Sequence, residues 1–227
     1  MDFATISADV IEYTSLTTTE KRELESGVRQ VLSELTEKYS SQGFFGRMVQ
    51  GDYIECAVKD PRYALRIALL LKTFIKSFEF QAPGTNKSRI KYFSEHGIRL
   101  AVAVAPLEKL DPNSGIIDGE AIYLSGRAIK NFSTSDKQKI IIKNTMFFCS
   151  PDNRLQQQFD VLFTLLDTIL SRCSSKQSEV VYYKLLDYTE KDIAATLKKN
   201  QSTISQHSTA AGWLSIEKTI TYFETIF

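Results

Sequence analysis

The sequence predicts an α+β sandwich over residues 1–150 and an all-α segment over residues 155–227. In the first part, β-favouring runs alternate with helical apolar patterns in the order strand, helix, hairpin, helix, strand, helix, strands. A Ser-Pro-Asp-Asn stretch at 150–153 is typical of a linker, and the apolar patterns beyond it are helical. This order favours a mainly antiparallel sheet with helices packed on one face.

The first strand and the first helix have clear local signals. Residues 3–10 are typical of a buried strand that ends near Asp9, and Thr17 stands three residues before Glu20, the spacing of a capping box. The apolar residues that follow recur at helical intervals: Leu24, Val28, Val31, Leu32, Leu35 and Tyr39. A Ser-Ser-Gln-Gly cluster at 40–43 is expected to end this helix.

Residues 46–58, GRMVQGDYIECAV, predict a β-hairpin with its turn between Val49 and Tyr53 and Asp52 at the tip. Aspartate after glycine favours a turn, which explains Asp52 without any function, and capping of a strand end or helix entry explains Asp9 equally well. The alternative is that the hairpin delivers Asp52 beside Asp9. Two converging carboxylates there could hold a divalent cation and, through it, a triphosphate.

The rest of the first part continues the same alternation. Asp60 and Pro61 are expected to begin a second helix, and residues 81–94 a basic connecting loop. Residues 98–106 predict a fully buried strand, and residues 111–118 a turn region.

A third helix is expected to begin at Gly119, and residues 139–143 and 145–149 are expected to supply a final strand pair. The inner face of that helix is predicted to carry Ile122, Ser125, Ile129 and Phe132. In the second part, helical patterns cover residues 155–173, 177–186, 190–197 and 202–212.

Composition narrows the class of protein. The longest aliphatic run, residues 67–71, is too short to cross a bilayer, so a cytoplasmic protein without a membrane partner is expected. Three scattered cysteines and two histidines show no zinc-ligand spacing. The net charge of +1 provides no long-range attraction to nucleic acid, so any contact with DNA requires a local patch.

Three segments together resemble class III nucleotide cyclases. ADVIEYTSL from Ala8 is similar to the first metal-binding segment of that family, the Gln-Gly-Asp hairpin to its second, and GEAIYLSGRA from Gly119 to its Asn/Arg helix. The resemblance implies a ferredoxin-like, nucleotide cyclase-like sandwich. It implies Asp9, Asp52 and the Val10 carbonyl as metal ligands, and a catalytic Arg127 that stabilises charge on the triphosphate. The implied cofactors are Mg or Mn with a purine nucleotide.

The sequence departs from that family at two positions. Tyr123 stands where the helix of the family has Asn, and Met48 stands where a purine-selecting Lys is common. Arg127 taken alone is typical of a solvated helix charge. These departures favour a degenerate domain that senses a nucleotide or dimerises over an active cyclase.

Residues 188–213, YTEKDIAATLKKNQSTISQHSTAAGW, predict a helix-turn-helix. Ala194 and Ala195 are small enough for a close helix crossing, and Ile193, Leu197 and Ile204 are expected to face the core. The residues left for DNA are Lys198, Lys199, Gln201, Ser202, Thr203, Ser205 and Gln206. Glutamine side chains can bond adenine edges, and lysine side chains can contact phosphates.

This stretch resembles the region-4-like helix-turn-helix of sigma factors and many bacterial regulators, with Lys198 where the turn commonly has Gly. Residues 176–227 contain six Lys, no Arg and six Asp plus Glu, so the segment is formally neutral. Weak non-specific affinity for duplex DNA is therefore expected, and a homodimer would strengthen binding.

The two parts in this order also resemble the SatD-like bacterial proteins. The leading hypothesis is a DNA-binding transcriptional regulator whose degenerate cyclase-like domain senses a ligand or dimerises. One alternative is an active metal-dependent nucleotidyl cyclase. Another is a protein-interaction module that binds neither DNA nor nucleotide.

Overall fold

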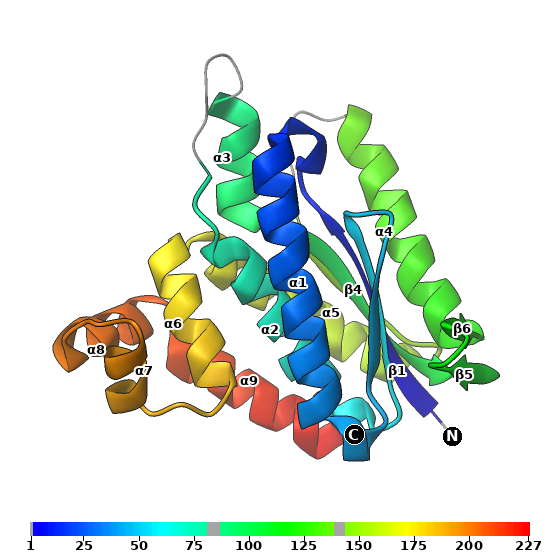
Figure 1. Ribbon diagram of the computed structural model, residues 1–227. Helices are drawn as coiled ribbons and strands as arrows, with labels where there is room; N and C mark the ends of the chain where they lie inside the picture. Colours follow the sequence, from blue (N-terminus) through cyan, green and yellow to red (C-terminus); the bar gives the residue numbers. More distant parts are fainter. Residues whose placement is uncertain (1, 81–86, 139–143) are drawn as a thin grey trace.

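The computed structural model describes residues 2–80, 87–138 and 144–227 (Figure 1). Its centre is a five-stranded sheet in the order β2-β3-β1-β4-β7. The strands are β1 (Asp2–Val10), β2 (Phe45–Val49), β3 (Tyr53–Val58), β4 (Ile98–Pro106) and β7 (Met146–Cys149). The first four pair antiparallel in the order of a ferredoxin-like βαββαβ unit, and β7 extends the sheet by pairing parallel with β4.

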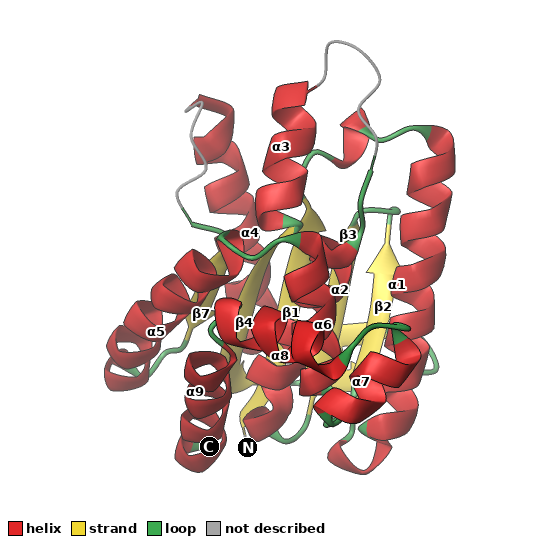
Figure 2. Ribbon diagram, turned by 90° about the vertical axis from the view of Figure 1, so that its left-hand side faces the viewer, coloured by secondary structure: helices red, strands yellow, loops and turns green. Residues whose placement is uncertain are grey.

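Helices cover both faces of this sheet, so the expectation that they all pack on one face was wrong. Alternating residues of β1 explain the two faces. Ala4 and Ile6 belong to the same buried cluster as the apolar residues of α1 (Thr18–Lys38) and α2 (Ala64–Ser77), whereas Thr5 and Ser7 hydrogen-bond Ser125 on the other side. Ser125 belongs to α4 (Glu120–Gln138), and Figure 2 shows α4 behind the sheet with α2 in front.

The predicted starts of the first two helices and the predicted hairpin are confirmed. Thr17 and Glu20 form a capping box at α1, and Asp60 with Pro61 begins a short 3₁₀ turn, Pro61–Tyr63, that leads into α2. β2 and β3 pair from Phe45 to Val49, with the turn where it was expected.

The segment predicted as a basic loop contains a helix instead. Residues 87–96 form α3 (Lys87–His96), while residues 81–86 lie outside the described residues. Phe93 is 1% exposed and packs against the aromatic ring of Phe80, so burial of an apolar residue overrides the loop-like charge of this stretch. The prediction gave too much weight to the proline and glycine that come before the helix.

A small hairpin occupies the predicted turn region, just before α4. It consists of β5 (Lys109–Asp111) and β6 (Ile116–Asp118). Gly119 has φ 131°, and a Cβ there would come within 2.6 Å of the backbone nitrogen of Glu108, so glycine is required at this position. Buried Ile122, Ser125 and Ile129 confirm the predicted inner face of α4 as far as it is described, and the side chain of Phe132 lies outside the described set.

The final strand prediction is confirmed in its second half. Residues 146–149 form β7, and residues 139–143 lie outside the described part of the chain.

Five helices follow the sheet. They are α5 (Asn153–Ser171), α6 (Ser175–Leu185), α7 (Glu190–Thr196), α8 (Gln201–Ala210) and α9 (Trp213–Ile226). The sequence analysis did not predict α9. Its buried residues Ile216, Ile220 and Phe223 have the helical spacing that predicts such a helix. Gly212, with φ 72°, separates α8 from α9.

α2 connects the sheet to the helical segment. Nearly all of its residues are buried, including Leu65, Leu69 and Leu70, because the sheet covers one side and α6 the other. One hydrophobic cluster includes residues of β1, α1, α2, α5, α6 and α9. The boundary drawn at residues 150–155 stays a prediction. No helix in the described ranges is long and apolar enough to cross a membrane.

Candidate functional site

α7 and α8 form two short helices joined by a tight turn. Thr189 caps α7, and its side-chain oxygen accepts a hydrogen bond from the Asp192 backbone nitrogen. At the other end, the nitrogen of Lys198 donates to the Ala195 carbonyl at 3.3 Å, and the nitrogen of Lys199 donates to the Ala194 carbonyl at 2.9 Å. This double closure is a Schellman motif, and it sets the direction in which α8 leaves the turn.

Lys198 has φ 52°, the left-handed conformation that glycine adopts most easily. The sequence departure at this position therefore does not change the turn geometry. It places a lysine in a conformation that costs on the order of 1 kcal/mol for a residue with a side chain.

A small apolar cluster holds the two helices together. Val180 of α6, Ile193 and Ala194 of α7, and Ile204 of α8 are all buried against one another. Ala194 is buried at the crossing, whereas Ala195 is exposed, so the prediction that Ala195 serves the crossing was wrong. The inward positions predicted for Ile193 and Ile204 are confirmed, and Leu197 is half-buried against the same cluster.

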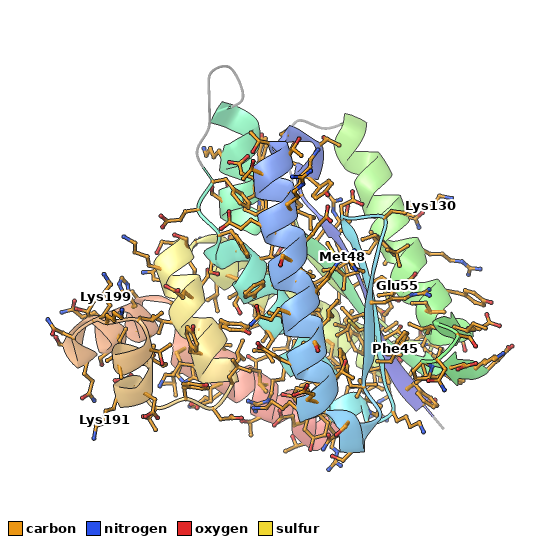
Figure 3. The ribbon with its side chains drawn as sticks, in the orientation of Figure 1. Phe45, Met48, Glu55, Lys130, Lys191 and Lys199 are labelled. Carbon is orange, nitrogen blue, oxygen red and sulfur yellow. The ribbon has the colours of Figure 1, made fainter. Side chains whose placement is uncertain are left out.

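The seven residues predicted to contact DNA lie in the turn and on α8. Lys198, Lys199, Gln201, Ser202 and Gln206 are exposed, and Thr203 and Ser205 are half-buried. Figure 3 shows Lys199 and Lys191 of α7 at opposite ends of this unit, both away from the sheet. Lys191 was not among the predicted contacts, although it is an exposed cation on the neighbouring helix.

At the opposite side of the molecule, the hairpin tip reaches the end of β1 as predicted. The backbone nitrogen of Val10 donates to the Asp52 carbonyl at 3.0 Å. Gln50 and Gly51 both have positive φ, 55° and 81°, and turn the chain toward β1. The structure therefore brings the backbones of the two predicted metal-binding segments together.

The Asp9 side chain lies on the α4 side of the sheet. Its Oδ2 accepts a hydrogen bond from Nη1 of Arg99 at 3.0 Å, and Arg99 stands directly opposite Asp9 in the β1–β4 register. The Tyr53 ring packs in the cluster under α4. Burial raises the pKa of its phenol, and the nearby charge of Asp9 acts in the same direction. The sequence analysis missed Arg99, although one charge in an otherwise apolar strand signals a buried partner.

The Asp52 side chain lies beside α1. The pKa of its carboxyl group is raised, mainly by burial and also by the nearby charge of Glu25. A backbone hydrogen bond and the charge of Lys21 act in the opposite direction. Tyr13 donates a hydrogen bond to Glu25, and burial followed by this bond raises the pKa of Tyr13 to about 12. A Cβ on Gly51 would lie 2.9 Å from the Tyr13 oxygen, so the tip is tightly packed here.

The two carboxylates therefore have different neighbours, Arg99 for Asp9 and Glu25 for Asp52. Oδ2 of Asp9 is held by the guanidinium of Arg99. Within the described parts of the chain, no three His, Cys, Asp or Glu side chains form a group that could hold a metal ion.

Arg127, the predicted phosphate-stabilising residue, is exposed on α4. Its positive charge acts on the nearby Tyr123 phenol, and that phenol donates a hydrogen bond to Asp118. Both residues lie on the outer surface of α4, and Tyr123 is 49% exposed. The structure does not place Arg127 with either carboxylate of the same chain.

Met48, at the expected purine-selecting position, and its neighbour Arg47 face different sides of β2. Nε of Arg47 donates to Glu55 across the hairpin at 2.9 Å. The guanidinium also donates to the Gly115 carbonyl, and this second contact connects β2 to the β5–β6 turn. Met48 packs against the main core. Figure 3 shows Met48 near α1 and Glu55 toward α4.

Comparison with known proteins gives a weak structural similarity and no family. No family model matches the chain, and no curated protein matches it. Two solved structures, each of a bacterial light-regulated adenylyl cyclase, align over 65% of the chain with 12% identity and a TM-score of 0.43. The aligned region covers 74% of the first of those chains and 43% of the second. Similarity at this level assigns no activity.

Proposed function

We propose that the protein binds duplex DNA sequence-selectively through α7, the turn and α8. The observation that supports this proposal is that α8 has two different faces. One face buries Ile204 against α7, and the other leaves Gln201, Ser202 and Gln206 exposed. Exposed amide and hydroxyl groups on the second helix of a helix-turn-helix are the groups that bond base edges in the major groove.

The chemistry of the exposed groups suits the major groove. α8 enters the groove as the recognition helix, where Gln201 and Gln206 can form paired hydrogen bonds with adenine edges. Lys198 and Lys199 at its N-terminal side contact phosphates and fix the orientation on the duplex. Ser202, Thr203 and Ser205 add hydrogen bonds to bases or backbone.

Charge sets the expected strength of binding. The formally neutral segment 176–227 gives little non-specific attraction, so two copies binding two half-sites one helical turn apart would supply the affinity. We therefore propose a homodimer on DNA, with the sheet-containing part as the dimerising or sensing unit of a transcriptional regulator.

The first prediction concerns the α8 contacts. Sequences selected from a random duplex pool by the full chain should bind with a salt-dependent Kd, measured by fluorescence anisotropy. Gln201→Ala should reduce discrimination at one base pair by about 1–3 kcal/mol, and Lys199→Ala should weaken all sequences alike and reduce the salt slope by about 1.

Lys218→Ala is the matched control, because Lys218 is an exposed lysine on α9 that is not among the proposed contacts. Equal affinity for selected and unselected duplexes, or loss of binding by Lys218→Ala but not Lys199→Ala, would count against the proposed interface.

A second candidate function is binding of a purine nucleotide with Mg or Mn at the hairpin tip. The observation in its favour is the contact between Val10 and Asp52, which brings the two predicted segments side by side. A thermal-shift titration with ATP or GTP, with and without manganese, tests it, since only the wild type and not Asp9→Ala/Asp52→Ala should be stabilised.

A further inference from the structure

A cavity of about 390 Å³ lies where three parts of the chain meet. Arg66 comes from α2, Lys184 from the end of α6, Tyr188 from the α6–α7 connection, and Trp213 and Ile220 from α9. Figure 1 shows α9 passing below α6 and α2 at this place. The volume falls within the range of small-molecule sites, and the cavity is separate from the exposed residues of α8.

Two aromatic rings form part of the cavity wall. Trp213 is the single tryptophan of the chain, and Nζ of Lys184 lies 5.5 Å from the centroid of its ring. Tyr188 contributes a second ring, and Ile220 adds a buried aliphatic surface. Together they offer a surface on which a flat apolar group can pack.

The two cations of the cavity are less exposed than its carboxylates. The side chains of Arg66 and Lys184 are 20% and 18% exposed, whereas that of Asp187 is 68% exposed. Glu217, the other acidic residue of the lining, is also exposed. The basic groups therefore lie deeper than the acidic groups of the lining, although their partners Glu224 and Glu190, each 27% exposed, are nearly as buried.

The present partners of these cations leave room for a negatively charged group. Nη1 of Arg66 binds Oδ1 of Asp187 at 3.2 Å, and Lys184 lies 3.6 Å from Oε1 of Glu190, beyond ordinary hydrogen-bond length. An ion pair with a carboxylate as exposed as Asp187 contributes little. Nε of Arg66 remains held by Glu224 at 2.9 Å, which keeps the guanidinium in place when Asp187 leaves.

We propose that this cavity binds a small aromatic carboxylate. The ring packs against Trp213 and Tyr188, and the carboxylate binds Arg66 and Lys184 in place of Asp187. Charge-assisted hydrogen bonds to a guanidinium and an ammonium supply the selectivity for an anion. This proposal does not depend on DNA binding.

Trp213 is a built-in reporter for the test. Its fluorescence in the full chain is titrated with sodium benzoate, and with benzylamine and benzyl alcohol as cationic and neutral probes of similar shape. Benzoate should change the emission saturably, and the other two probes should not.

Three variants separate the proposed contacts from general effects on folding. Lys184→Gln should weaken benzoate binding by about tenfold or more, because it removes a charged donor. Asp187→Asn should strengthen binding roughly two- to fivefold, because it removes the competing carboxylate, and a folding defect does not produce that result. Arg62→Gln, which removes an exposed arginine paired with Asp60 outside the cavity lining, should leave binding unchanged.

Any of three results would overturn the proposal. The first is no saturable change with benzoate, and the second is an equal Kd for benzyl alcohol, which would mean a plain apolar cavity. The third is an unchanged benzoate Kd in both Lys184→Gln and Asp187→Asn.

Discussion

Single residues decide the local geometry of both candidate sites. Lys198 closes α7 in a left-handed conformation, and Arg99 directs Asp9 toward β4. Neither effect follows from residue type alone. Lysine does not favour positive φ, and the partner of a half-buried carboxylate such as Asp9 depends on strand register.

A substitution at Lys198 tests the first of these effects. Lys198→Gly should raise the free energy of unfolding by about 1 kcal/mol, because glycine adopts φ 52° without the contact between Cβ and the backbone. Urea denaturation followed by circular dichroism measures the change.

Lys199→Gly is the matched control, because Lys199 is the next exposed residue and has no positive φ. It should be neutral or destabilising. If both variants were stabilised equally, the left-handed turn would not be the cause.

At the scale of elements, a buried polar network joins α2, β4, α5 and the residue before β7. Nζ of Lys72 lies 3.2 Å from Oδ1 of Asp167 and donates to the Ile98 carbonyl at 3.0 Å. Thr145 donates its hydroxyl to the same carboxylate at 2.6 Å and accepts from Lys72 at 2.8 Å. Both charges are almost completely buried, so each depends on its partners.

Breaking this ion pair should be costly. Lys72→Met should lower the free energy of unfolding by about 3–5 kcal/mol, since Asp167 would remain buried without its cation. The double variant Lys72→Met/Asp167→Leu should recover a large part of the loss. The measurement is urea denaturation of Lys72→Met, of Asp167→Leu and of the double variant.

Asp60→Asn serves as the control for this prediction, because the pair of Asp60 with Arg62 is more exposed, and its loss should cost about 1 kcal/mol or less. Equal losses for Lys72→Met and Asp60→Asn would show that burial does not govern the energetics of the Lys72 pair.

For the whole molecule, the important feature is the continuity of the core. α6 packs on α2, and Phe159, Phe163 and Phe223 of the helical segment belong to the same cluster as Ile6 of β1. Arg66 of α2 binds Asp187 and Glu224 from the helical segment. The two predicted parts thus share one buried interior.

This continuity predicts cooperative unfolding. The full chain should lose secondary and tertiary structure in a single transition, because unfolding either part exposes apolar surface of the other. A fragment of residues 153–227 should expose the inward faces of α5, α6 and α9 and show weak or aggregated helical signal. Two separate calorimetric transitions, together with a stable fragment, would instead support two independent domains.

The sequence predicted those features whose signals are local. The capping box of Thr17 and Glu20, the hairpin around Gly51, and the apolar positions Ile193 and Ile204 each depend on residues close together in the chain. Turn chemistry and helical periodicity are local properties, and a single sequence contains them in full.

The tertiary structure alone decided the rest. It placed α4 behind the sheet, made a helix of the segment with buried Phe93, and paired Asp9 with Arg99 rather than directing it toward Asp52. Each of these depends on contacts between residues far apart in the chain. Such contacts are fixed by strand register and by which apolar surfaces remain to be covered, and neither can be read from a local pattern.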